Sequence, residues 1–360
     1  MELGIIGLAT SGKTTIFNAL TGSNLPTLAA SLGKLELHRA TVAVPDHRLA
    51  QLSELYHPQK TIHAQVTYID IAGLEKDIGK EGLSGPLRNQ IATMDAFVHV
   101  VRAFESNCVP HPLGNVDPQR DLTLLHNEML LADLLTVEKR LTNIAAQLQK
   151  GAQRSARPAL LAEQELFQQL RTTLEEERPL RSLELGAHER ETIAGYGLLS
   201  LKPVLVLLNT GDDVIPPAEL VTYNYPQTRL MSLRGQLELE ISQLPEDEVE
   251  LFMEEFEISE PVRQRVIRRS YELIGLISFF TVGADEVRAW NLKRGESALD
   301  AAATIHTDLA RGFIRAEVLP YQELLAIGNL NAARQEGLLQ LEGKDYIVQD
   351  GEIVHIRFSI

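Results

Sequence analysis

A glycine-rich segment near the amino terminus has the residue types and spacing of a phosphate-binding loop. Residues 7–14 read Gly-Leu-Ala-Thr-Ser-Gly-Lys-Thr, which matches the pattern G-x-x-x-x-G-K-[ST]. In such a loop the backbone N–H groups turn toward a phosphate, Lys13 reaches the β- and γ-phosphates, and the Thr14 hydroxyl ligates Mg²⁺. We therefore expect a nucleoside triphosphate to bind here. The candidate binding residues of this loop are Gly7, Ala9, Thr10, Ser11, Gly12, Lys13, Thr14 and Thr15.

A second segment, Asp70-Ile71-Ala72-Gly73, supplies groups that the same chemistry needs. A carboxylate at the end of a strand can hold Mg²⁺ through water, and the Gly73 N–H can meet a γ-phosphate, so that the following loop senses hydrolysis. Thr14 and Asp70 are therefore the candidate metal ligands. By itself D-x-x-G is more often a plain turn at a strand end, but a phosphate-binding loop in the same chain favours the functional interpretation.

A third segment, Asn209-Thr210-Gly211-Asp212, has the asparagine and acid spacing of a base-reading N-K-x-D loop. Asp212 can accept two hydrogen bonds from a guanine edge. Thr210 stands where a lysine would flank the base, which weakens a guanine preference without excluding it. Without the other motifs the segment would be interpreted as a plain loop. We include Asn209, Asp212 and Ser232 among the candidate nucleotide-binding residues.

These motifs need a scaffold, and the sequence predicts an α/β sheet with crossover helices. The predicted strands are residues 2–6, 65–71, 97–101 and 204–208, and a helix is predicted over residues 13–20. The phosphate-binding loop thus follows a strand and opens a helix. The strand pattern stops after residue 101 and resumes about a hundred residues later, which indicates an insertion.

The inserted residues have the periodicity of helices. Apolar residues step by four and three from Leu130 to Leu148, and a second stripe runs from Leu160 to Leu174. A polar tip that carries Lys150, Arg154 and Arg157 lies between the stripes. We expect an antiparallel helical hairpin, built either as an extended coiled coil or as ordinary bundle core. The cations at the tip could meet RNA phosphates, or the tip is simply solvated.

The last eighty residues change period again. The sequence predicts strands over residues 287–292 and 314–319 and a helix over residues 297–309. Residues 345–358 are expected to fold back around Asp350-Gly351 as a β-hairpin. Together these segments indicate a compact α+β module.

Composition limits the partners and the compartment. The 360 residues carry 49 acidic and 34 basic side chains, a net charge of −15 that opposes general attachment to DNA or anionic lipid, so any RNA contact must be local. Residues 238–260 hold ten carboxylates, which form either a solvated face or a docking patch. Cys108 is the single cysteine, and no apolar run spans a bilayer. We expect a cytoplasmic protein without a membrane anchor.

Taken together, the motifs resemble the YchF family of Obg-related P-loop NTPases, also known as Obg-like ATPases. The resemblance extends over nearly the whole chain through a set of short similar segments. They are residues 7–21, 44–49 (Val-Pro-Asp-His-Arg-Leu), 70–74, 99–102 (His-Val-Val-Arg), 280–283, 286–290, 305–308, 312–318 and 342–351.

The resemblance implies a G domain at residues 1–118 and 200–277, an inserted coiled-coil domain at 119–199, and a TGS-like β-grasp domain at 278–360. It also implies Mg²⁺, ATP or GTP, and a role at the ribosome, through rRNA or a ribosomal protein that meets the hairpin or the TGS domain.

The chain departs from the family pattern at named positions. Thr10 stands where members usually carry Asn, which argues against assistance by potassium. Lys34 lies where a loose alignment expects the switch I threonine, and Asp212 lies in the base loop where adenine preference is associated with Glu. Leu74 follows Gly73 where Ras-like enzymes place a water-orienting Gln, and a leucine forms no hydrogen bond to that water. The candidate catalytic residues are Lys13, Gly73 and Leu74, and intrinsic hydrolysis is expected to be slow.

Three functions compete. The leading hypothesis is a slow regulatory ATPase or GTPase that acts as a ribosome-associated switch. The alternative is a nucleotide-stabilised binding module with little or no turnover, because several catalytic positions depart from a well-equipped GTPase. A small-molecule kinase would also use a phosphate-binding loop, but the heptad insertion and the TGS-like tail are poor candidates for its acceptor pocket and lid.

Overall fold

The computed structural model describes residues 1–26, 37–71, 83, 85–150, 155–256, 258 and 260–359. The chain divides into two compact units, the first made of Met1–Ala40 and Thr67–Arg263, the second of Thr41–Val66 and Gln264–Ile360. The sequence-based ranges assigned residues 41–66 and 264–277 to the first domain, whereas in the structure they group with the second unit. Among the described residues, no helix is long and apolar enough to cross a membrane.

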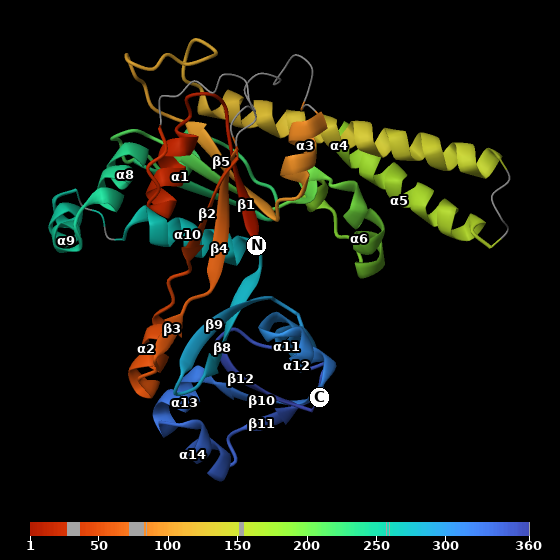
Figure 1. Cartoon of the computed structure of the whole chain (residues 1–360). Helices are drawn as coiled ribbons and strands as arrows, with labels where there is room; N and C mark the ends of the chain where they lie inside the picture. The colour runs from red at the N-terminus through yellow and green to blue at the C-terminus, as the bar shows by residue number, and fades with distance from the viewer. Residues whose placement is uncertain are drawn as a thin grey trace. The chain divides into compact units, whose positions relative to one another are not determined.

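The first unit is built on a six-stranded sheet with the order β2-β4-β1-β5-β6-β7, of which β1, β2, β4 and β5 are labelled in Figure 1. Four neighbouring pairs, from β4–β1 to β6–β7, are parallel. The strands are β1 (Glu2–Ile6), β2 (Leu37–Ala43), β4 (Gln65–Ile71), β5 (Ala96–Arg102), β6 (Val204–Asn209) and β7 (Thr228–Leu233). Strands β5 and β6 are buried along their whole length, as expected for a parallel sheet covered on both faces.

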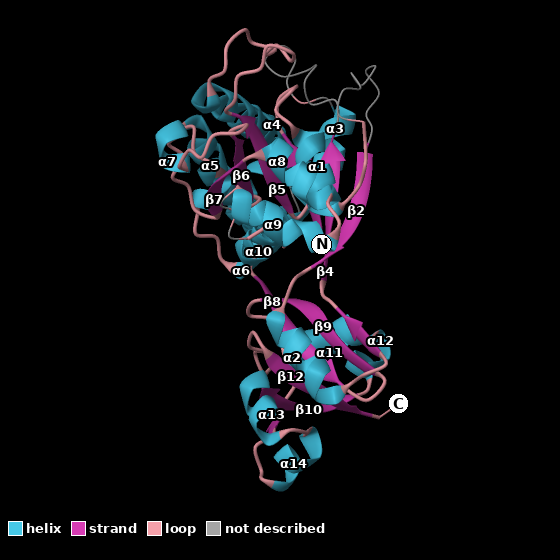
Figure 2. Ribbon diagram, turned by 90° about the vertical axis from the view of Figure 1, so that its left-hand side faces the viewer, coloured by secondary structure: helices cyan, strands magenta, loops and turns pink. Residues whose placement is uncertain are grey.

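Helices cover both faces of this sheet. Side chains of α3 (Gly85–Ala92) and α4 (Pro118–Gln149) share one apolar cluster with the strands. Helix α1 (Lys13–Thr21) packs against α8 (Gly235–Gln243), in front of the sheet in Figure 2. The remaining helices of the unit are α6 (Ala187–Ile193), α7 (Pro217–Leu220) and α9 (Glu246–Glu255), with short 3-10 turns at Leu180–Ser182, Ala194–Tyr196 and Leu199–Leu201. Helix α10 (Val262–Leu273) crosses the boundary between the units.

The predicted helical hairpin is present as α4 and α5 (Arg157–Glu175), which pack against each other. Leu130, Val137 and Ile144 of the predicted seam are buried, and Phe167 and Leu170 of α5 join the same apolar layer. At the base of the hairpin, Asp133 accepts hydrogen bonds from the backbone N–H groups of Leu199 and Ser200, both at 2.7 Å. The hairpin is therefore anchored to the chain that returns to β6.

The second unit contains a six-stranded sheet with the order β11-β10-β12-β8-β9-β3. The strands are β3 (Lys60–Ile62), β8 (Leu276–Val282), β9 (Glu286–Lys293), β10 (Phe313–Pro320), β11 (Gln340–Glu342) and β12 (Glu352–Phe358). The helices are α2 (His47–Tyr56), α11 (Ala298–Ile305), α12 (Thr307–Arg311), α13 (Tyr321–Ile327) and α14 (Leu330–Gln335). Strand β3 pairs in parallel with β9, which explains why residues 41–66 belong to this unit.

Two C-terminal predictions need correction. The helix predicted over residues 297–309 is two helices, because His306 has an extended backbone and its ring accepts the Asp308 N–H as the N-cap of α12. The β-hairpin predicted over residues 345–358 has only one strand, β12. Gly351 does turn the chain, with φ +91°, but the preceding residues form a single bridge between Ile347 and Ser297 instead of a ladder.

Candidate functional site

The phosphate-binding loop connects β1 to α1 at the carboxyl edge of the parallel sheet. Its two glycines occupy conformations and spaces that other residues do not fit. A Cβ on Gly7 (φ +153°) would lie 2.3 Å from the Val100 carbonyl oxygen, and a Cβ on Gly12 (φ +95°) would lie 2.5 Å from Asn209 Nδ2. Gly12 is also the N-cap of α1, so the positive end of the helix faces the bend. The loop therefore has the backbone of an anion-binding site.

Lys13 and Thr14, the first two residues of α1, contribute the polar side chains. Lys13 Nζ donates to the Leu8 carbonyl oxygen at 2.8 Å and is nearly buried, so its ammonium group lies over the loop. Thr14 Oγ1 donates to Asp70 Oδ2 at 2.9 Å. Asp70 is 3% exposed and lies near the end of β4, the strand next to β1. The hydroxyl and the carboxylate predicted to ligate a metal are thus brought together by neighbouring strands.

These two oxygens fit a magnesium site of the P-loop type. Mg²⁺ prefers hard oxygen ligands and usually takes one or two from the protein, the rest from phosphate and water. Among the described residues, no group of three or more His, Cys, Asp or Glu side chains forms a metal cage. A metal at Thr14 and Asp70 would therefore depend on the nucleotide for much of its coordination.

The segment predicted to read the base has a structural role for its asparagine. Asn209 Nδ2 donates to the Ser11 carbonyl oxygen at 3.2 Å, and Asn209 Oδ1 accepts the Gly235 N–H at 3.1 Å. The side chain thus joins the phosphate-binding loop to the loop after β7. The buried Thr210 hydroxyl donates to Asp213 O at 2.5 Å, which tightens the turn. Asp212 is exposed, and its contact with a base stays a prediction.

Ser232, near the end of β7, lies at the same edge of the sheet. Its hydroxyl oxygen is buried and has no hydrogen-bond partner among the described residues. The Ser11 hydroxyl of the phosphate-binding loop is also buried and has no hydrogen-bond partner among the described residues. Buried hydroxyls are normally satisfied, so two unsatisfied ones around one predicted nucleotide site are consistent with a ligand that supplies the partners.

Other predicted residues are placed as follows. Ala9 and Thr15 are half-buried in the loop and in the first turn of α1, and Thr10 is exposed. Gly73, Leu74 and Lys34 lie outside the described residues. Of the histidines that a catalytic base would call for, His63 and His306 belong to the second unit, and His99 is buried in β5. Burial, with His126 and Lys13 nearby, lowers the pKa of His99 to about 3.

The structure adds a functional neighbour that the motif analysis did not single out. Arg102, the last residue of β5, is 1% exposed, and its Nη1 donates to Thr10 Oγ1 at 3.1 Å. Its guanidinium also donates to the carbonyl oxygens of Phe104 and Val109, at 3.0 Å and 2.8 Å. Burial lowers its pKa below the usual value. Its position at the carboxyl end of a central strand was the available signal, because ligands of open α/β sheets bind at that edge.

Phe104 follows Arg102 and contacts the base-reading segment. A Cβ on Gly211 would lie 2.9 Å from Phe104 Cβ, and the Arg102 guanidinium carbon lies 4.4 Å from the centre of the Phe104 ring. The loops after β1, β5 and β6 are thereby tied together. The arrangement can hold a triphosphate at the glycine bend, a cation at Thr14 and Asp70, and a base toward Asp212.

Known proteins resemble this chain in sequence and in structure. A family model described as a 50S ribosome-binding GTPase matches residues 2–140, and the YchF-type GTPase C-terminal model, described as a protein of unknown function, matches residues 276–359. The ribosome-binding ATPase YchF of Bacillus subtilis is 37% identical over 369 residues and 100% of both chains. The Obg-like ATPase 1 of Oryza sativa subsp. japonica is 32% identical over 100% of this chain and 92% of its own. The solved structure of the Schizosaccharomyces pombe YchF GTPase matches with a TM-score of 0.85 at 31% identity, over 99% of this chain and 97% of that one.

Proposed function

The chain belongs to the YchF family of P-loop nucleotide-binding NTPases, and from that premise we propose that it is a Mg²⁺-dependent regulatory NTPase that binds ATP or GTP, hydrolyses it slowly and acts as a switch at the ribosome. The predicted family and fold class are confirmed by these similarities. We take the ribosome as the partner because relatives are named as ribosome-binding. A ribosomal partner would place the chain in the cytoplasm. The single observation that carries the nucleotide part is the Thr14–Asp70 oxygen pair beside the glycine bend.

The geometry supports a separate role for each of several residues of this chain. The bend and the start of α1 bind the phosphates through backbone N–H groups, and Lys13 moves from the Leu8 carbonyl oxygen to the terminal phosphates. Thr14 and Asp70 would hold Mg²⁺, which neutralises charge on the β- and γ-phosphate oxygens when it is bound. Asn209 and Arg102 fix the loop that these groups share.

Slow turnover follows from the residue after Gly73. A leucine at position 74 offers no hydrogen bond to an attacking water, so acceleration would come from a partner or from reordered loops. The alternative, a nucleotide-stabilised binding module with little or no turnover, rests on the departures at Thr10, Lys34, Thr210 and Leu74. The two functions share a binding site and differ only in the hydrolysis rate.

Competition binding of ATP and GTP, each with and without Mg²⁺, tests the site. We expect one nucleotide to bind more tightly, with affinity that falls when Mg²⁺ is removed. Lys13→Ala is the matched control and should lose most of the affinity. If neither nucleotide binds, the proposed function fails.

Single-turnover hydrolysis then separates the switch from the silent module. A slow rate that exceeds that of Lys13→Ala supports the NTPase, whereas equal rates leave only the binding module. Co-sedimentation with purified ribosomes, with each nucleotide and with none, tests the partner. A regulatory switch requires that ribosome binding differ between the nucleotide states.

A further inference from the structure

A buried arginine of the first unit has no acidic partner. Arg102, the last residue of β5, is 1% exposed, and among the described residues its guanidinium forms no ion pair. The groups that accept its hydrogen bonds are neutral: the Thr10 hydroxyl and the carbonyl oxygens of Phe104 and Val109. A buried charge is costly unless an opposite charge pairs with it. The described part of the chain thus provides no opposite charge in contact with this arginine.

Two carboxylates act on Arg102 only at longer range. Asp121 Oδ2 pairs with His111 Nε2 at 2.8 Å, and its Oδ1 pairs with Arg120 Nη2 at 2.8 Å, so both of its oxygens have partners of their own. Glu105 is exposed to solvent. Both acids favour the charged form of Arg102, but burial is the larger effect and lowers its pKa. Full compensation of the buried charge would therefore require an anionic ligand.

Arg102 is linked directly to the predicted phosphate-binding loop. Its Nη1 donates to Thr10 Oγ1 at 3.1 Å, and Thr10 lies in the glycine bend, three residues before Lys13. The Nε–H and one N–H of Nη2 donate to the carbonyl oxygens of Phe104 and Val109. Since Nη1 and Nη2 each carry a second N–H, the guanidinium keeps donors that no described residue uses. The charge therefore lies one hydrogen bond away from the bend.

A second buried arginine of the same unit shows what burial alone can mean. Arg181 is 5% exposed and also donates to neutral groups, the Ser200 carbonyl oxygen and the Tyr223 hydroxyl. Neither partner belongs to the motif segments of the predicted nucleotide site. Burial among neutral acceptors is thus compatible with a purely structural role, and the link to the glycine bend is what distinguishes Arg102. Arg181 is therefore a matched control.

We propose that Arg102 supplies a fixed positive charge behind the phosphate-binding loop, which strengthens phosphate binding and favours a nucleoside triphosphate over a diphosphate. The inference rests on the proposed function, because it concerns the same nucleotide site. An arginine keeps its charge at any physiological pH, and water screens a charge in the interior less than one at the surface. Because Arg102 acts through Thr10, it is a positioning residue, whereas Lys13 is the cation expected to reach the terminal phosphates.

Isothermal titration of the full-length chain with the Mg²⁺ complexes of ATP, ADP, GTP and GDP tests the inference. Arg102→Gln should weaken triphosphate binding about thirtyfold and diphosphate binding only about fivefold, because the triphosphate complex carries more negative charge. Arg102→Lys keeps the charge and should bind both forms within about threefold of wild type. Arg181→Gln should bind both forms as wild type does. Urea unfolding of each variant establishes that it is folded.

An equal loss of triphosphate and diphosphate affinity in Arg102→Gln would overturn the inference and leave Arg102 as a structural support of the loop. If Arg102→Gln does not fold, Arg102→Lys decides, because a loss of roughly tenfold or more for both forms would show that the shape of the guanidinium matters and its charge does not. If the wild-type chain binds no nucleotide, the proposed function itself fails. If wild type binds and the ratio is unchanged in Arg102→Gln, the proposed function stands without this inference.

Discussion

Thr10 combines an uncommon backbone with a buried partner. Its φ of +59° lies in the left-handed region, which β-branched residues rarely adopt and which Asn tolerates better. The hydrogen bond that Arg102 donates to the Thr10 hydroxyl offsets the conformational cost of this backbone. The phosphate-binding loop is thus held in shape by a side chain from a strand ninety residues away in sequence.

We expect Thr10→Val to lower nucleotide affinity about tenfold, because the buried guanidinium loses one acceptor at roughly 1.5 kcal/mol. Thr10→Asn keeps an acceptor and suits the backbone, so it should retain affinity and raise the free energy of unfolding. Equilibrium titration with a fluorescent ATP analogue measures the first effect, and thermal unfolding measures the second. Equal affinity for wild type and Thr10→Val would show that Arg102 does not shape the loop.

The buried His99 should contribute to the pH dependence of the stability of the first unit. Burial, His126 and Lys13 lower its folded-state pKa to about 3, while the unfolded value is near 6.5. Between these values mainly the unfolded chain binds the proton, so stability falls as the pH falls through about 6.5 and changes little above about pH 7.5. By pH 5.5 the loss from this residue should be about 1.4 kcal/mol.

Urea unfolding of wild type and His99→Gln at pH 7.5, 6.5 and 5.5 measures this contribution. The substitution shifts stability at every pH, so the relevant quantity is the change between pH values. We expect His99→Gln to lose less stability than wild type on acidification, by about 1 kcal/mol between pH 6.5 and 5.5 and only about 0.4 kcal/mol between pH 7.5 and 6.5. Parallel curves for the two proteins would contradict a neutral, buried His99.

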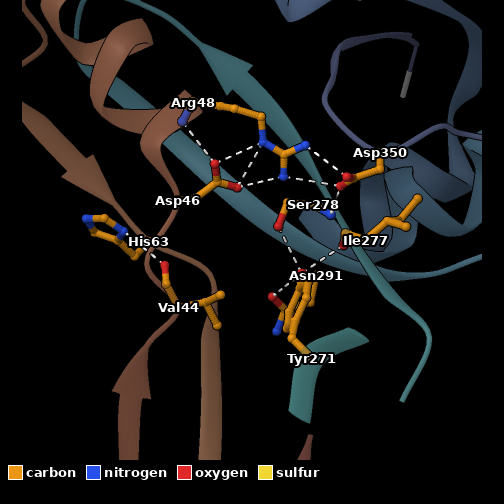
Figure 3. A network of polar contacts seen from close by, with 9 residues as sticks. All are labelled: Val44, Asp46, Arg48, His63, Tyr271, Ile277, Ser278, Asn291 and Asp350. Carbon is orange, nitrogen blue, oxygen red and sulfur yellow. Dashed lines mark hydrogen bonds and ion pairs between the residues drawn. The ribbon is translucent and has the colours of Figure 1, made fainter. Parts of the chain in front are cut away.

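Among the elements, α2 is held by one ion-pair network within the second unit (Figure 3). Asp46 caps α2 by accepting the Arg48 N–H, and the Arg48 guanidinium pairs with Asp46 at 2.7 Å and with Asp350 at 2.9 Å. Asp350 Oδ1 also accepts the Ser278 N–H at the start of β8. Burial opposes the charge of Arg48, but the two carboxylates outweigh it and raise its pKa. The network fastens residues 41–66 to the C-terminal sheet.

Arg48→Met should therefore destabilise the second unit by about 2 kcal/mol, since it leaves two carboxylates without their partner at a partly buried site. Hydrogen exchange should increase in α2 and β3 more than in β10 and β12. Arg39→Met, which removes an exposed pair with Glu2, is the control and should change little. Unchanged protection of α2 in Arg48→Met would mean that apolar packing alone holds it.

For the whole molecule, the two compact units should respond differently to nucleotide. A ligand that binds only the folded first unit stabilises it by about 2.7 kcal/mol at a hundred times its dissociation constant. We expect ATP or GTP with Mg²⁺ to raise the unfolding temperature of the first unit and to leave that of the second unchanged. Calorimetry with hydrogen exchange on each unit can separate the transitions.

Removal of Mg²⁺ with EDTA should abolish most of that stabilisation, and Thr14→Val should do the same in the presence of the metal. The reason is that Thr14 and Asp70 supply the protein oxygens of the proposed metal site. Equal stabilisation by nucleotide with and without Mg²⁺ would argue that the Thr14–Asp70 pair is structural only.

The sequence by itself determined the scaffold of the predicted phosphate site and indicated its candidate residues. Glycine spacing, the Lys13-Thr14 pair and the apolar strands are local patterns, and parallel strands bring their following loops to one edge whatever the rest of the chain does. Asp70 accordingly lies within hydrogen-bond distance of Thr14, while their role as metal ligands stays a prediction, and the hairpin insertion was visible from its heptad steps.

Only the tertiary structure decided which residues far apart in the chain contact one another. Residues 41–66 group with the second unit, Asn209 braces the loop, and Arg102 supports Thr10. Each of these depends on a contact between residues far apart in the chain. Such pairings leave no period or motif in the sequence, because a strand or an arginine looks the same locally whichever sheet or carbonyl oxygen it meets.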